Sequence, residues 1–286
     1  MNTCTYRFFS LFRHLILCLI LFCLSPSLYA QPGTDAQLAN HYYNNGDYAK
    51  AKEYYEKLYK REPIKLYFER YYQCLIAESD WKTAEKILKQ QVDYSNGEVE
   101  YSVMLAQFYE DRQEQSKADK IYKSLVDNLS PNPTAIINLF NAFKSKGKND
   151  LAFQTITKGR GLLKNSYPLH FQFAEYYGAT KETKKMIQEY LDLVDYSANY
   201  KTSVQNVLSR IIDFSATSSE EYVALKTELL QRTQSRPDDL VLSELVTWFF
   251  IQSKDFPTAL MQEQAMDKRM DLKGRRVYDL GIICVE

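Results

Sequence analysis

Residues 38–63 read LANHYYNNGDYAKAKEYYEKLYKREP, and this stretch decides the fold. Two segments with apolar residues at helical spacing flank Asn45-Gly46-Asp47, a tripeptide that is typical of turns. Pro63 follows the second segment and marks its end, because a proline cannot continue a helix without losing a backbone hydrogen bond. The stretch therefore predicts a helical hairpin, in which two antiparallel helices are joined by a short turn.

The same pattern returns along the chain at a fixed interval. It is marked by four alanines at spacings of 33, 34 and 34 residues, namely Ala51, Ala84, Ala118 and Ala152. A constant period of this length indicates one supersecondary unit that is copied and stacked. A small side chain at mid-helix allows two helix backbones to approach closely, which explains the alanine. One hairpin cannot bury its apolar face alone, so stability comes from contacts between neighbouring units.

The repeated unit resembles the tetratricopeptide repeat, whose period is 34 residues. In the first copy the matching positions are Leu38, Ala39, Tyr42, Ala51, Tyr55 and Pro63. Only Asp35 departs, because the family has a tryptophan there. The resemblance implies an all-α fold, a right-handed α-α superhelix (solenoid) of tetratricopeptide-like helical hairpins. It also implies a non-enzymatic protein that binds other proteins.

The register divides the chain into segments of unequal regularity. We expect repeats 1 to 5 in residues 31–199, a degenerate helical repeat in 200–238, and repeat 7 plus the first helix of an incomplete repeat in 239–286. The fifth copy carries Met186 where the alanine is expected. One period of 34 beyond Ala259 falls outside the sequence, which ends at Glu286. This pattern predicts that the sequence is the N-terminal part of a longer protein.

The first 30 residues differ from the rest. Arg7 and Arg13 lie near an apolar run at 15–24, and Ala30 offers a small residue for cleavage. These are the features of a secretory signal peptide. We therefore predict export to the periplasm or cell envelope of a Gram-negative bacterium. The run is shorter than the roughly 20 residues of a membrane-spanning helix, and an uncleaved signal anchor is the alternative and the only predicted contact with a membrane.

Charge and cysteine content exclude several classes of protein. Without residues 1–30 the chain has 34 basic and 36 acidic side chains, a net charge of −2. A nucleic-acid binder is expected to carry a basic excess, so we predict no nucleic-acid partner. Beyond the signal the only cysteines are Cys74 and Cys284, which make no disulfide framework. Cys74 is expected to pack as a small hydrophobic residue.

No motif for catalysis, metal binding or phosphate binding is present in the sequence. His41 and His170 stand far apart, on different repeats, and His41 is expected to be a surface or half-buried packing residue. Gly159-Arg160-Gly161 lacks the context of a phosphate loop, and we expect it to loosen the end of a helix. We therefore predict no enzyme activity, no catalytic residue, no cofactor and no metal site.

One set of polar residues recurs in register on the first helices. The set occupies two positions of the first helix, three residues apart. In the tetratricopeptide family the earlier of these two positions faces the concave groove, and an asparagine there often hydrogen-bonds to the backbone of a bound peptide. Amides suit this role because they both donate and accept. The resemblance thus implies a peptide-binding row, made of Asn40, Tyr43, Gln73, Gln107, Glu110, Asn141, Lys144 and Glu175. The alternative is that exposed helix positions favour polar residues whatever the function.

Two functions follow as hypotheses. The first is a tetratricopeptide-repeat scaffold that binds a protein or peptide partner in the cell envelope. The second is the exported sensor or docking region of a longer signalling protein, with an effector domain beyond residue 286. The residues do not name the partner in either case, because a repeat scaffold fixes architecture and not specificity.

Overall fold

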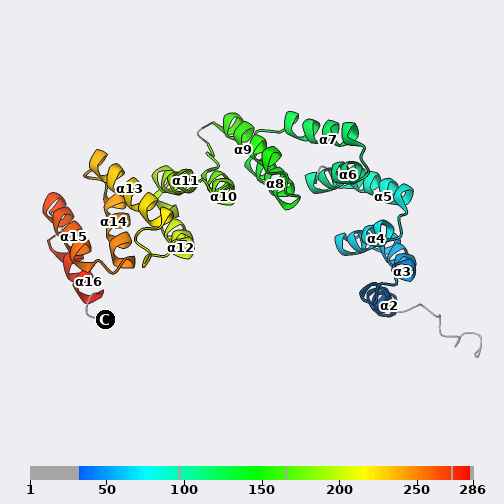
Figure 1. The fold of residues 1–286 in the computed structure, drawn as a ribbon, viewed down its shortest axis with the longest axis horizontal. Helices are drawn as coiled ribbons and strands as arrows, with labels where there is room; N and C mark the ends of the chain where they lie inside the picture. The colour runs from blue at the N-terminus through cyan, green and yellow to red at the C-terminus, as the bar shows by residue number, and fades with distance from the viewer. Residues whose placement is uncertain (1–31, 96–97, 165, 272, 284–286) are drawn as a thin grey trace, which may run out of the picture. The chain divides into compact units, whose positions relative to one another are not determined.

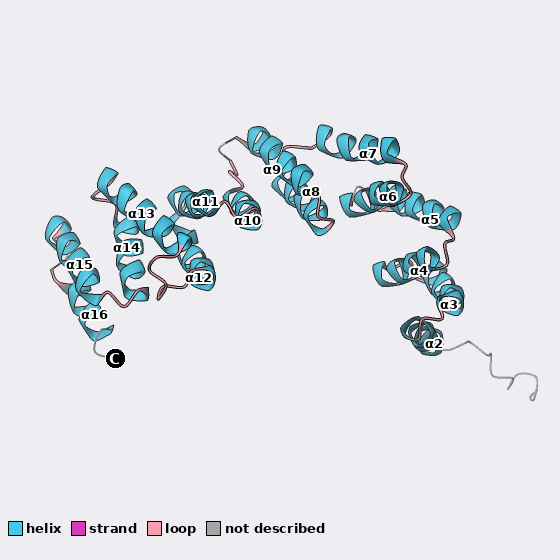
Figure 2. Ribbon diagram, viewed as in Figure 1, coloured by secondary structure: helices cyan, strands magenta, loops and turns pink. Residues whose placement is uncertain are grey.

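The computed structural model describes residues 32–95, 98–164, 166–271 and 273–283. The predicted signal peptide, residues 1–30, lies outside these described residues. Over the described ranges the chain forms fifteen α-helices, one short 3₁₀ helix and no strand (Figures 1 and 2). This confirms the all-α class. No helix of the described ranges is both long and apolar enough to cross a membrane.

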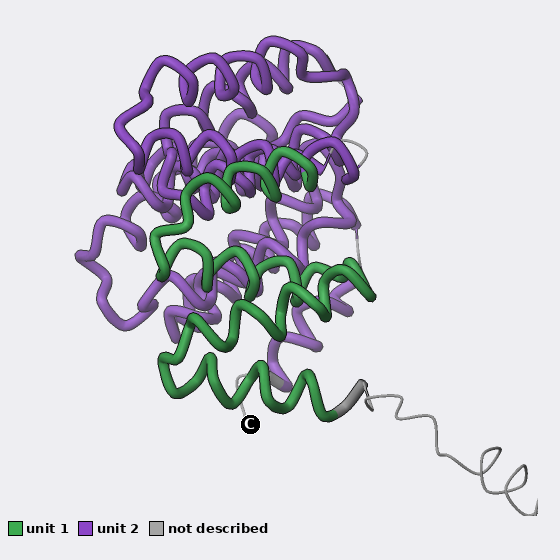
Figure 3. Tube along the Cα trace, turned by 90° about the vertical axis from the view of Figure 1, so that its right-hand side faces the viewer, with its two compact units in different colours: residues 1–91 green, residues 92–286 purple. Residues whose placement is uncertain are grey.

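The chain divides into two compact units, residues 1–91 and 92–286 (Figure 3). The first unit contains α2 (Pro32–Asn44), α3 (Tyr48–Arg61), α4 (Lys65–Ala77) and most of α5 (Trp81–Tyr94). The second contains α6 (Val99–Asp111), α7 (Gln115–Asp127), α8 (Pro133–Ser145), α9 (Asn149–Leu163), α10 (His170–Ala179), α11 (Thr183–Tyr196), η1 (Ala198–Tyr200), α12 (Lys201–Ile211), α13 (Glu220–Ser235), α14 (Leu240–Gln252), α15 (Phe256–Met270) and α16 (Arg275–Ile283).

Consecutive helices pack as hairpins. Extensive helix contacts join α2 with α3, α6 with α7, α8 with α9, α10 with α11 and α14 with α15, and α3 contacts α4 of the following copy to a similar extent. Further contacts connect successive hairpins, for example α6 with α8 and α7 with α9. Within the second unit, α6 thus lies beside its own partner α7 and beside the next first helix, α8, as the stacking of a helical repeat requires. These contacts confirm the predicted fold of stacked tetratricopeptide-like helical hairpins.

Within the ranges that the structure describes, six turns between helices share one geometry. In each, one residue has a positive φ, and the next residue donates its N–H to the carbonyl five positions back, as Asp47 does to Tyr42 at 2.9 Å. This is the Schellman ending of a helix. The residues with positive φ are Gly46, Ser79, Gln113, Gly147, Lys181 and Lys254. Since only two of the six are glycines, composition alone hides the other four turns.

The alanines that mark the period are buried. Ala51, Ala84 and Ala118 are fully buried, and Ala152 is 1% exposed. Cys74 is fully buried as well, which confirms its packing role, and burial raises the pKa of its thiol to about 11. His41 is exposed, in agreement with a surface position. The interior of each hairpin is therefore close-packed around small side chains at the predicted positions.

Two glycines correct or complete the sequence interpretation. We expected Gly159 to loosen a helix end, but α9 continues to Leu163, and Gly159 is buried against Ile136. Its function is close packing, since a Cβ there would lie 2.5 Å from Ile136 Cγ2. In the fifth copy, Gly178 leaves room for the larger side chain of Met186. A Cβ added at Gly178 would lie 3.1 Å from Met186 Sδ. The missing alanine is thus replaced by a glycine on the facing helix.

Candidate functional site

The first unit holds three residues of the predicted row, Asn40 and Tyr43 on α2 and Gln73 on α4. The Tyr43 hydroxyl donates to Gln73 Oε1 at 2.7 Å, which joins the first helices of two hairpins. Arg70 donates to the same oxygen at 3.3 Å, and its guanidinium lies 4.2 Å from the Tyr43 ring centre. This contact combines hydrogen bonding with a cation–π interaction. Tyr43 and Gln73 thus form one bridge between neighbouring repeats.

Asn40 is bonded within its own hairpin. Its Oδ1 accepts from the Tyr55 hydroxyl at 2.8 Å, and burial raises the pKa of Tyr55, so the phenol stays a donor. Asn40 and Gln73 are both exposed. Their carbonyl oxygens are occupied, but no bond among the described residues engages their amide nitrogens. These two nitrogens are therefore available to donate to an acceptor from outside.

In the second unit the row begins on α6. Gln107 donates through Nε2 to Asp111 Oδ1 at 2.7 Å along its own helix. Glu110 pairs with Lys148 and accepts from the Tyr122 hydroxyl at 3.3 Å. Burial, followed by the nearby Glu110 carboxylate, raises the pKa of Tyr122, which keeps this hydroxyl protonated. Glu110 is thus held by α7 and by the turn before α9.

The remaining row residues lie on α8 and α10. Lys144 forms an ion pair with Glu175, and so links the first helices of two consecutive hairpins. This pair has the same register as Tyr43 with Gln73, since it joins the later position of one copy to the earlier position of the next. Asn141 is exposed, and it has no side-chain hydrogen bond within the described residues. The row therefore combines two bridges between repeats with unpaired amide groups.

A cavity of about 490 Å³ adjoins this part of the row. Its lining includes Glu110, Tyr122 and Lys148, together with side chains from α7 and α9 such as Asp119 and Lys123. Carboxylates and ammonium groups line it together with apolar side chains such as Val126 and Leu151, so the pocket is of mixed charge and partly apolar. Alignment of single positions could not show this pocket, because it forms only where α6, α7 and α9 pack together.

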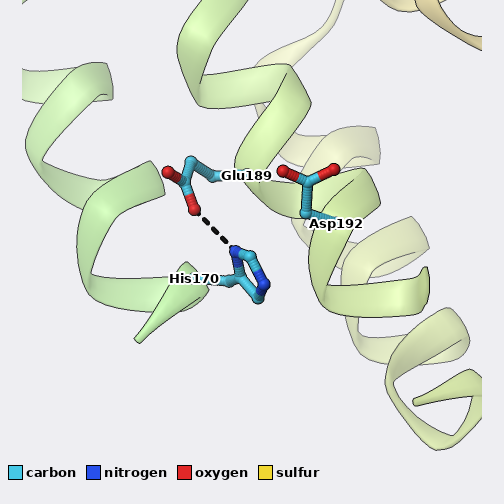
Figure 4. Close-up of side chains that lie close together, drawn as sticks. All are labelled: His170, Glu189 and Asp192. Atoms are coloured by element: carbon cyan, nitrogen blue, oxygen red, sulfur yellow. Dashed lines mark hydrogen bonds and ion pairs between the residues drawn. The ribbon is translucent and has the colours of Figure 1, made fainter. Parts of the chain in front are cut away.

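A second polar cluster was not expected from the sequence. His170 on α10 and Glu189 and Asp192 on α11 lie close together, with His170 Nδ1 2.7 Å from Glu189 Oε2 (Figure 4). Their ligand atoms lie within 4.8 Å of one another, which is a spacing that could accommodate a metal ion. The sequence separates His170 from both carboxylates, and packing of α10 against α11 brings them together.

Two arginines already occupy these oxygens. Arg160 donates to both oxygens of Glu189, at 3.0 and 2.7 Å, and Arg232 donates to Asp192 at 2.7 Å. Burial alone would raise the pKa of Glu189, but hydrogen bonds from His170 and Arg160 outweigh it and hold that pKa below its usual value. The cluster is therefore an ion-pair network that ties together α9, α10, α11 and α13.

Comparison with known proteins gives similarity at the level of the fold. No family model matches the chain, and no curated protein sequence matches it either. The C-terminal part of a TPR repeat-containing protein from Cytophaga hutchinsonii is 15% identical with a TM-score of 0.34, over 79% of this chain and 91% of that one. The TPR2AB-domain:pHSP90 complex of yeast Sti1 is 14% identical with a TM-score of 0.29, over 90% of this chain and 99% of that one. The human IFIT1 dimer with m7Gppp-AAAA is 15% identical with a TM-score of 0.30, over 77% of this chain and 67% of that one.

Proposed function

We propose that this protein is a non-enzymatic scaffold that binds an extended segment of a protein partner along the polar row. The observation that carries the proposal is that the amide nitrogens of Asn40 and Gln73 and the whole amide of Asn141, all on exposed first-helix positions, have no hydrogen-bond partner within the described residues. An extended peptide presents alternating carbonyl and N–H groups. The free nitrogens can donate to its carbonyls, and the Asn141 amide can match both kinds of group, without selecting particular side chains.

The bridges within the row support this proposal and do not compete with it. Tyr43 with Gln73 and Lys144 with Glu175 fix the distance between neighbouring first helices. Groups held in place before binding lose less conformational entropy when the ligand arrives. The bridges therefore preorganise the amides that would contact the peptide, and we treat the row of each unit as a separate surface.

Binding is tested with a matched pair of variants in the second unit. The full chain, carrying Gln107→Ala and Asn141→Ala, is used to capture proteins from an envelope extract of its own organism, followed by mass spectrometry. The control carries Gln231→Ala and Gln234→Ala, which remove two exposed amides from α13, away from the α6, α7 and α9 cavity. We expect the first variant to lose specific partners that wild type and control retain. Equal capture by all three folded proteins would reject the second unit's row as the binding surface.

We also propose that the protein acts in the cell envelope after removal of residues 1–30. The support is the charged start, the short apolar run and the small residue at the predicted cut. N-terminal sequencing of protein isolated from fractionated cells tests this directly. Residue Gln31 at the N-terminus in the envelope fraction is the expected result. An intact Met1 in the cytosolic fraction would contradict export and would leave the binding experiment unaffected.

A further inference from the structure

A small aromatic cavity lies in the second unit, and no residue of the row is in its lining. It has a volume of about 250 Å³ and forms where the start of α10 meets the end of α11 and η1. Its walls include the rings of Tyr167, Phe171, Tyr196 and Tyr200. Phe171, Tyr196 and Tyr200 are each between 37 and 46% exposed. Single exposed aromatic residues are ordinary, but several gathered around one cavity mark an interaction site.

Gln172 also lines this cavity, and it is the unusual member of the lining. The residue is only 8% exposed, and its Oε1 is buried without a hydrogen-bond partner. An unpaired buried acceptor destabilises the protein, so its presence calls for an explanation. The terminal torsion of a glutamine is soft, and the oxygen can therefore turn toward a donor that enters the cavity. The missing partner must donate an N–H or O–H group.

Three other polar groups around the cavity already have partners. The Tyr196 hydroxyl donates to the Ser166 carbonyl at 3.0 Å, and the Pro168 carbonyl accepts from Arg160 Nε at 2.7 Å. His170 Nδ1 is engaged by Glu189, whose other contacts come from Arg160. The cavity therefore offers aromatic faces, the tyrosine hydroxyls at their edges and the buried unmatched acceptor of Gln172, and its lining contains no carboxylate to neutralise a cation.

We propose that this cavity receives a tryptophan side chain of a partner protein, with the indole between the aromatic rings and its Nε1–H donated to Gln172 Oε1. Indole is a flat apolar group with a single donor and no acceptor, which matches the lining. A sugar ring carries several hydroxyls, and an apolar wall would leave most of them unpaired at a cost. A lysine or arginine would bring a charge that no free carboxylate balances. This proposal uses residues outside the row and does not depend on it.

The test measures binding of N-acetyl-L-tryptophanamide to the full chain by NMR titration. Its 1-methylindole counterpart, which lacks the N–H donor, is the matched probe. Wild type should bind the parent probe about tenfold more tightly, as expected when one hydrogen bond to a buried acceptor is lost. Gln172→Met keeps the volume and removes the acceptor, so it should bind the two probes equally.

A second pair of variants guards against misfolding as an explanation. Tyr200→Ala removes one wall and should weaken both probes, whereas Tyr278→Ala removes a tyrosine that is 70% exposed on α16 and should change neither. Four results would overturn the proposal: no saturable binding by folded wild type, equal affinity of wild type for both probes, an unchanged preference in Gln172→Met, or binding of methyl glucoside in place of the indole.

Discussion

The close contact between Gly159 and Ile136 gives the sharpest prediction on stability. A Cβ added at Gly159 would lie 2.5 Å from Ile136 Cγ2, 3.0 Å from Cδ1 and 3.2 Å from Cγ1. Ile136 is fully buried and branched at Cβ, so it cannot turn aside freely. Gly161 lies two residues further along the same helix, is exposed, and has nothing within 4 Å of its would-be Cβ. The two glycines therefore form a matched pair.

The magnitudes decide the sign of each substitution. Alanine is favoured over glycine within a helix by up to about 1 kcal/mol. Overpacking a close-packed core costs about 1–3 kcal/mol. Gly161→Ala gains the helix preference of alanine without overpacking, so it should stabilise the protein. Gly159→Ala gains the same helix preference but also overpacks the core. Because the helix preference cancels in the comparison, the free energy of unfolding of Gly159→Ala should lie about 1–3 kcal/mol below that of Gly161→Ala.

Urea unfolding followed by circular dichroism measures this difference, and the variants are comparable where the slope of the transition is unchanged. Combining Gly159→Ala with Ile136→Ala adds an independent check. The new methyl then occupies space left by the isoleucine, so the double variant should be more stable than the sum of the single effects predicts. Gly159→Ala as stable as Gly161→Ala would refute the argument from close packing.

Three further predictions concern the interior. Ala84→Leu should lower the free energy of unfolding by about 1–3 kcal/mol in thermal melts, because it overpacks a fully buried site, whereas Ala77→Leu at an exposed site should not. The lowered pKa of Glu189 stabilises the folded state fully above the ordinary glutamate pKa of 4.5, and this stabilisation is lost as pH falls through the lowered value. Glu189→Gln should therefore flatten the acid side of the stability curve, and an unchanged curve would contradict the ion-pair assignment. Cys74, with its pKa raised to about 11, should react with a thiol reagent at pH 8 only after unfolding when it is the sole cysteine; rapid labelling of the folded chain would contradict this.

Local pattern was a reliable guide to the helices and their period. The alanine spacing located buried positions because the need for a small side chain at a helix contact is the same in every copy. Glycine content was a poorer guide to the turns. Ser79, Gln113, Lys181 and Lys254 adopt the same left-handed conformation as Gly46, because the hairpin packing on both sides holds it there against a steric cost of roughly 1–2 kcal/mol.

The candidate sites also combine features that the repeat register predicts with contacts that only the structure shows. Register alone located the row, and it correctly placed all eight residues on first helices, but it could not show that Tyr43 bonds Gln73 or that Lys144 pairs with Glu175. It also missed the cluster around Glu189 entirely. Arg160, His170 and Glu189 come from three helices, and no motif connects residues at such irregular spacing.

The amino-acid sequence by itself determined that this protein is a series of helical hairpins, because helix periodicity, turn residues and small buried side chains act over a few residues and repeat. Only the tertiary structure decided which polar groups are paired and which are left open. The contact of Gly159 with Ile136, the arginine pairing of Glu189 and the unpaired oxygen of Gln172 each depend on how separate helices pack against one another. Such contacts are set by how complete helices pack, and so they cannot be read from the residues one at a time.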